Sequence, residues 1–174
     1  MTVSLHTASI DAYLQILPSV LRWLDKAEAH CRAAGGGDEA LTGCRLAPDM
    51  WDFAKQVSQC AYHSAGAIRG VRAGVFRPDP TPVPQEIAAL RSEIESAIAF
   101  LKTVDPGELD AIAQRDMVFE FGERRMDFTV ADFLLSFSLP NFFFHATSAY
   151  AILRNQGLAV GKRDFLGALR LKGA

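Results

Sequence analysis

The sequence predicts an all-α protein: a four-helix bundle with one small β-hairpin before the last long helix. Apolar residues recur every three or four positions in four long segments, which is the spacing of one helix face. Proline and glycine separate these segments. Of the 174 residues, 49% are hydrophobic, enough to bury one core, so we expect a single domain over residues 1–174.

The first predicted helix covers residues 9–34. Pro18 lies inside this segment and predicts a kink or a late start, because proline lacks a backbone donor. The helix should end at the three glycines 35–37, which accept left-handed conformations. Its apolar face carries Ile10, Tyr13, Leu17, Leu24 and Ala27.

The second predicted helix begins at Pro48, a residue that suits the first helical position. Asp49 and Asp52 follow, where the helix dipole favours negative charge. The helix weakens towards Gly74. Residues 77–84 hold prolines at alternate positions, so we expect an extended connection there.

The third helix, residues 84–104, has the most regular apolar stripe. Residues 117–128 alternate apolar and polar side chains about a glycine, which predicts the β-hairpin. The fourth helix, residues 129–155, begins at Thr129, whose hydroxyl can cap the first turn. Pro140 predicts a bend within it.

Composition excludes several functions. The formal charge is −2 and the basic residues are scattered, so we expect no nucleic-acid binding. The N-terminus shows no secretory signal. The most hydrophobic segment, residues 133–153, is interrupted by too many polar residues to cross a membrane. Three cysteines without metal-binding spacing indicate free thiols. We therefore expect a cytoplasmic protein with no membrane contact.

Polar residues interrupt two apolar helix faces. Asn141 and His145 lie one turn apart on the predicted inward face of the fourth helix, which also includes Phe144. The second helix carries a polar stripe with Gln56, Gln59 and His63. If the two faces meet, these five polar residues line a small cavity that could hold a small-molecule ligand.

The triplet Phe142-Phe143-Phe144 predicts an interface. Successive helical residues point about 100° apart, so three rings cover most of the circumference. One core cannot bury them all, and we expect a homodimer that covers the remainder, although the hairpin alone could suffice.

Five segments carry a family resemblance: residues 46–50, 54–57, 139–145, 149–154 and 161–167. Together they resemble the bacterial "domain of unknown function 1993" family, within the DinB/YfiT-like superfamily. The resemblance implies a helical bundle, and implies little about activity. Members of the superfamily typically hold Zn or Ni with three histidines, one from the second helix and two from a His-x-x-x-His pair on the fourth.

At the matching positions this chain has Gln59, Asn141 and His145. An amide oxygen is a poor zinc ligand, so we expect no bound metal, and a network in which the three side chains satisfy one another. A metal-free polar network favours a ligand-binding or non-enzymatic protein. The alternative is a metal-dependent hydrolase or thiol transferase that holds Zn or Ni with His145 and either His63 or Cys60.

Overall fold

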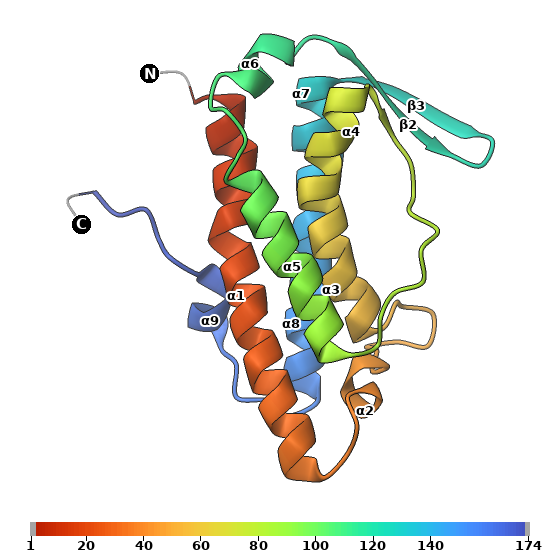
Figure 1. Ribbon diagram of the computed structural model, residues 1–174, viewed down its shortest axis with the longest axis vertical. Helices are drawn as coiled ribbons and strands as arrows, with labels where there is room; N and C mark the ends of the chain where they lie inside the picture. The colour runs from red at the N-terminus through yellow and green to blue at the C-terminus, as the bar shows by residue number, and fades with distance from the viewer. Residues whose placement is uncertain (1–2, 173–174) are drawn as a thin grey trace.

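The computed structural model describes residues 3–172 and is mostly helical, with a small three-stranded sheet (Figure 1). Several long helical segments lie side by side, and β2 and β3 project from one end of them. The α-helices are α1 (Leu5–Ala34), α2 (Glu39–Thr42), α3 (Phe53–Ala61), α4 (Ala67–Ala73), α5 (Ile87–Leu101), α6 (Glu108–Ile112), α7 (Val130–Asp132), α8 (Leu139–Asn155) and α9 (Lys162–Leu166).

Two π-helical turns, η1 (Tyr62–Gly66) and η2 (Phe133–Ser138), join α3 to α4 and α7 to α8 without a break. The mostly helical prediction is confirmed. A count of four helices is not, because short helices stand between and after the long segments.

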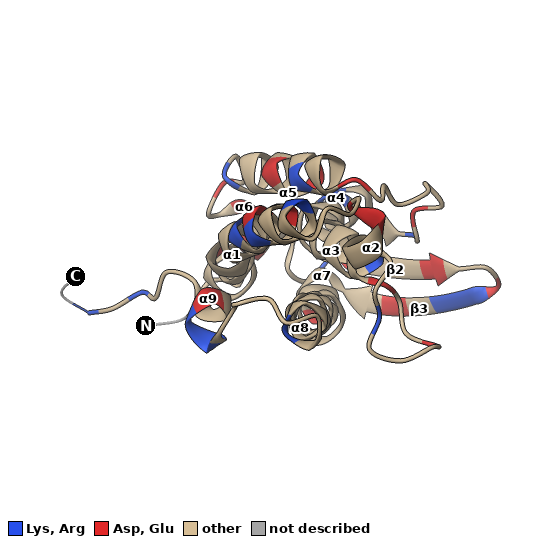
Figure 2. Ribbon diagram, turned by 90° about the horizontal axis from the view of Figure 1, so that it is seen from below, with Lys and Arg blue, Asp and Glu red and all other residues tan. Residues whose placement is uncertain are grey.

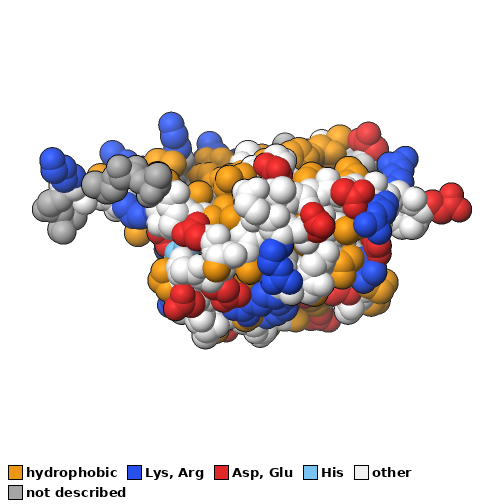
Figure 3. All heavy atoms as spheres, turned by 90° about the horizontal axis from the view of Figure 1, so that it is seen from above, with side chains coloured by type: hydrophobic (Ala, Val, Ile, Leu, Met, Phe, Trp, Pro, Cys, Tyr) orange, Lys and Arg blue, Asp and Glu red, His pale blue; other side chains and the backbone are white. Residues whose placement is uncertain are grey.

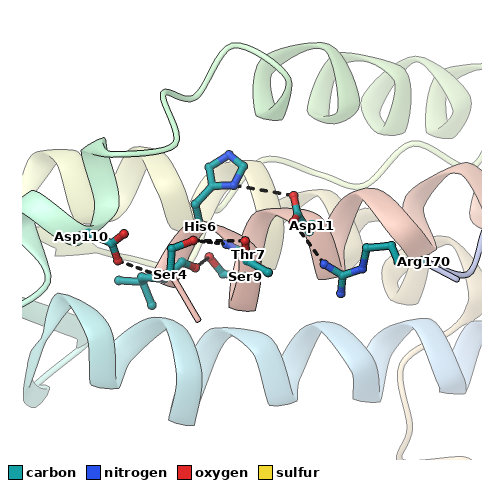
Figure 4. A network of polar contacts seen from close by, with 8 residues as sticks. Ser4, His6, Thr7, Ser9, Asp11, Asp110 and Arg170 are labelled. Atoms are coloured by element: carbon teal, nitrogen blue, oxygen red, sulfur yellow. Dashed lines mark hydrogen bonds and ion pairs between the residues drawn. The ribbon is translucent and has the colours of Figure 1, made fainter. Parts of the chain in front are cut away.

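The first helix begins four residues earlier than predicted. Ser4 caps it by accepting a hydrogen bond from the backbone N–H of Thr7 at 3.0 Å. The carboxylate of Asp110 in α6 accepts from the N–H of Leu5 at 2.7 Å (Figure 4). These contacts satisfy donors that a helix start leaves free, so Pro18 lies well inside α1 and does not delay its start.

The second helix begins five residues later than predicted, at Phe53. Asp52 is its N-cap and accepts from the N–H of Lys55 at 2.9 Å. A capping carboxylate outweighs the preference of Pro48 for a first helical position. Residues 48–52 instead form a turn that carries Trp51 back over the helix face.

The two π turns contact each other. The hydroxyl of Ser138 in η2 donates to the backbone carbonyl of His63 in η1 at 2.6 Å. A π turn uses one residue more than an α turn and rotates everything that follows. Pro140 is the second residue of α8, and the π turn η2 ends two residues before it at Ser138.

The predicted hairpin is present, but the sheet has a third strand. β2 (Asp116–Phe121) pairs antiparallel with β3 (Arg124–Thr129), and β1 (Val75–Phe76) pairs parallel with β2. Two residues are too short a run to show alternation in the sequence. Gly70 of α4 allows this strand to approach, since a Cβ there would lie 2.9 Å from the ring of Phe76.

Buried apolar side chains from all the long segments form one core cluster. The segment after α8 also contributes: Phe165 of α9 stacks on fully buried Trp23 with ring centroids 5.7 Å apart. Gly167 then passes so close to α1 that a Cβ would lie 2.2 Å from the carbonyl oxygen of Gln15.

Charged side chains of both signs are spread over most elements (Figure 2). The face seen in Figure 3 likewise mixes acidic, basic and apolar side chains. Within residues 3–172, no helix has the length and apolar character that crossing a bilayer requires.

Candidate functional site

A pocket of about 550 Å³ lies between α3 and α8 and reaches the turn before α3 and the sheet. All five polar residues singled out from the sequence line it. Its other lining residues come from the turn, from the start of α3, from η1 to residue 79, from β2, from η2 and from α8: Asp49, Met50, Trp51, Lys55, Tyr62, Phe76, Pro78, Asp79, Phe119, Phe121, Phe137 and Phe144.

The best-defined polar contact joins the two helices. Nδ1 of His145 lies 2.7 Å from Oε1 of Gln56, and both residues are almost completely buried. The Nε2 amide of Gln56 donates to the backbone carbonyl of Trp51 at 3.2 Å. Gln56 therefore holds both His145 and the turn that carries Trp51.

The predicted network of Gln59, Asn141 and His145 is wrong. Asn141 turns back on its own helix, where its amide nitrogen donates to the carbonyl of Phe137 at 2.7 Å. Such local bonds are a common alternative for short polar side chains. His145 bonds Gln56 instead, and Gln59 lines the pocket without a hydrogen bond to either residue among those described.

Three rings stand in sequence along the wall of the pocket. His145 stacks on Trp51 with centroids 5.5 Å apart and an angle of 14°, and on His63 with centroids 5.4 Å apart and an angle of 20°. His63 is buried, and its Nδ1 is enclosed without a hydrogen-bond partner among the described residues.

Both histidines are neutral at pH 7. Burial, and then the neighbouring His145, lowers the pKa of His63 to about 3. Burial, and then the positive charge of Lys55, lowers the pKa of His145 to about 4. The polar groups inside the pocket are thus uncharged, whereas the charged lining residues Asp49, Lys55 and Asp79 come from its outer turns and the start of α3.

Sequence reasoning missed the aromatic walls. Phe119 and Phe121 of β2 and Phe137 of η2 face the same space as the histidines. The alternation of the predicted hairpin places Phe119 and Phe121 on one face of the sheet. This pattern could have indicated that the two rings share an aromatic wall. Trp51 gave no signal, because the second helix was predicted to begin before it.

Phe144 lines the pocket beside Asn141 and His145, but most of its side chain is uncovered. Phe144 is 56% exposed at the pocket, while Phe142 is fully buried and meets Tyr13 edge-on at 4.8 Å. Asn141, Phe144 and His145 lie on the side of α8 that lines the pocket, whereas Ser138 and Phe142 are buried in the core.

Cys60 does not belong to the pocket. Its side chain is fully buried in the core, and its thiol donates to the backbone carbonyl of Gln56 at 3.4 Å. Burial raises the pKa of this thiol, so the thiolate that metal binding or nucleophilic attack requires is disfavoured. The burial of Cys60 outside the pocket therefore does not support a role for its thiol in metal binding.

The donor set of the pocket does not fit a tightly held zinc or nickel ion. Within residues 3–172, no three His, Cys, Asp or Glu side chains are grouped as metal ligands. Two neutral imidazoles stand beside three amides, two of which already donate to backbone carbonyls. Protein zinc sites use at least three strong ligands.

A second hollow, of about 1030 Å³, lies between α3, α4 and α5 under residues 77–84. Tyr62 stands at its boundary with the first pocket and donates to the backbone carbonyl of Arg77. The half-buried Glu93 lines it, and burial raises the pKa of this carboxyl group. The five polar residues singled out from the sequence line the first pocket, and of these only Gln59 also lines the second hollow.

Fold and pocket together define a mostly helical protein with a small sheet and a pair of buried histidines. The chain belongs to the family described as "Domain of unknown function (DUF1993)", whose model matches residues 5–166. A DinB family member protein from Shewanella denitrificans has a similar structure, with a TM-score of 0.79 and 24% identity over 98% of this chain and 96% of that one. That likeness concerns the fold. No curated protein matches the sequence.

Proposed function

We propose that this protein binds a small, uncharged, largely aromatic molecule in the pocket between α3 and α8. The observation that carries this proposal is the lining: aromatic rings form most of the wall, and a few neutral polar groups stand among them. A volume of about 550 Å³ suits a small organic ligand, and this combination of surfaces is typical of ligand sites.

The charge of the pocket favours a neutral ligand. His63 and His145 are both uncharged at pH 7, so neither offsets the free-energy cost of dehydrating an ionic ligand. Lys55 lies over the ring of Trp51, 5.4 Å from its centroid, and supplies the nearest positive charge at the outer edge.

The test uses Trp51 as a reporter. The chain has two tryptophans, and Trp23 lies in the core, where it packs on α9 rather than on the pocket. In a Trp23→Phe variant, the uncharged probe N-phenylnaphthylamine is expected to change Trp51 fluorescence saturably, with one probe per chain.

Asn141→Phe fills the pocket and should abolish this binding. Thr147→Phe places the same ring on the exposed side of α8 and is the matched control, which should bind as the parent does. No saturable signal in the parent, or equal binding by both variants, would contradict the proposal.

We also propose that the chain forms a homodimer in the cytoplasm. Phe144 leaves much of its ring uncovered, and Trp51 and Phe121 are similarly exposed around the same pocket. Cys31, Cys44 and Cys60 are free thiols, the form that a reducing compartment maintains. Metal-dependent hydrolysis or thiol transfer stays an alternative prediction; the ligand set of the pocket does not support it.

A further inference from the structure

Building on the proposed function, we infer that the pocket selects an aromatic ligand bearing a hydroxyl group, which donates a hydrogen bond to Nε2 of His145 and accepts one from Nε2 of His63. The inference rests on which ring nitrogens carry protons. The surrounding hydrogen bonds fix this for both histidines.

The first step is the orientation of Gln56. Its amide group contacts a backbone carbonyl, that of Trp51, at one atom and His145 at the other. A carbonyl only accepts, so the atom facing Trp51 must be the NH₂ nitrogen. The atom facing His145 is therefore the amide oxygen.

The second step is the tautomer of His145. An amide oxygen cannot donate, so Nδ1 of His145 must carry the proton in this 2.7 Å contact. In a neutral imidazole the other nitrogen then has a free lone pair. Nε2 makes no hydrogen bond within residues 3–172 and is not among the polar atoms enclosed without a partner, so the pocket offers an acceptor at this atom.

The third step is the tautomer of His63. Its Nδ1 is enclosed and has no partner among the described residues. Enclosing an N–H without an acceptor is rarer in proteins than enclosing an unpaired acceptor, so we place the proton on Nε2. That nitrogen is not enclosed in the same way, and His63 lines the pocket, so it presents a donor.

The two histidines thus offer one acceptor and one donor on neighbouring, nearly parallel rings whose centroids lie 5.4 Å apart. A hydroxyl group can donate and accept at once, whereas an ether only accepts and a hydrocarbon does neither. The aromatic walls enclose the ring that carries the hydroxyl. A phenol-type molecule meets both requirements without bringing charge into the pocket.

Calorimetric titration with naphthol, its methyl ether and naphthalene tests this inference. Naphthol is expected to bind about tenfold more tightly than the ether, because the ether leaves the lone pair of His145 unpaired. In His145→Phe the preference should disappear while the ether still binds. Gln56→Met keeps the imidazole but frees its tautomer, and should also weaken the preference.

NMR of the imidazole nitrogens gives a second readout, independent of affinity. Before ligand is added, His145 is expected to carry its proton on Nδ1 and His63 on Nε2, and naphthol should shift the Nε2 signals of both. Equal binding of naphthol and its ether, or the opposite tautomer at His145, would overturn the inference and leave the aromatic pocket standing. If none of the three molecules binds, the proposed function fails together with this selectivity.

Discussion

At the scale of single residues, Gln56 and His145 show how far the sequence could lead. Helical spacing placed the polar residues of two helices on facing surfaces, and all five line one pocket. Helical spacing could not predict which side chains form hydrogen bonds with each other, because the pairing depends on the position and rotation of each helix to within about one residue. The sequence therefore suggested Asn141 as a partner of His145, whereas the structure uses Gln56.

The buried histidines predict an acid-sensitive fold. Their pKa values in the folded protein, about 3 for His63 and about 4 for His145, lie below the value of about 6.5 in an unfolded chain. The unfolded state thus binds more protons below about pH 6.5, so stability is complete above that pH and falls towards pH 4. Between about pH 7.5 and pH 5 we expect a loss of roughly 2 kcal/mol per histidine.

Urea unfolding at a series of pH values measures this loss. The double variant His63→Gln and His145→Gln should have a flatter profile over the same range, because neither glutamine titrates. His30→Gln, at an exposed position of α1, is the control and should keep the parent profile. A parent stability that is constant from pH 7.5 to pH 5 would exclude the predicted proton linkage.

At the scale of elements, periodicity predicted the long helices well, and the errors have local causes. Caps moved two helix starts, from residue 9 to Leu5 and from Pro48 to Phe53. The two π turns have no periodic signature, since each adds a single residue to an otherwise regular helix. The two turns contact each other through the hydrogen bond from Ser138 to the carbonyl of His63, a pairing that periodicity does not predict.

The close approach of α4 and β1 supports a prediction for Gly70→Ala. A methyl group there would lie 2.9 Å from Cδ2 and 3.2 Å from Cβ of Phe76, and the second of these atoms is fixed by the backbone. Overpacking of this kind costs about 1–3 kcal/mol, while alanine gains up to about 1 kcal/mol in a helix. We expect a net loss of about 1 kcal/mol in thermal or urea unfolding.

The same variant should also weaken binding of the aromatic probe, because Phe76 is a wall of the pocket. Gly37→Ala is the matched control: a Cβ there meets nothing within 4 Å, and stability and binding should not change. A Gly70→Ala protein as stable as the parent would mean that Phe76 yields freely and does not hold β1 in place.

At the scale of the whole molecule, the pocket depends on segments that are distant in the sequence. The turn at residues 49–51, the strand β2 and the helix α8 each supply one side of it. Pairing between such segments requires the complete fold, which explains why a set of polar residues could be predicted and the aromatic walls could not. The exposed aromatic residues around the pocket, Trp51, Phe121 and Phe144, follow from the same arrangement.

These three side chains give the homodimer prediction a specific surface. Aromatic rings are enriched in protein interfaces, and Phe144 is 56% exposed. Light scattering after gel filtration should give about twice the chain mass of 19.0 kDa for the parent, and Phe144→Ser should shift the population towards single chains. Leu169→Ser removes a side chain that is almost equally exposed, at 53%, on the C-terminal segment, and should leave the mass unchanged. A parent of single-chain mass would refute the dimer, and a dimer that survives Phe144→Ser would place its interface on another face.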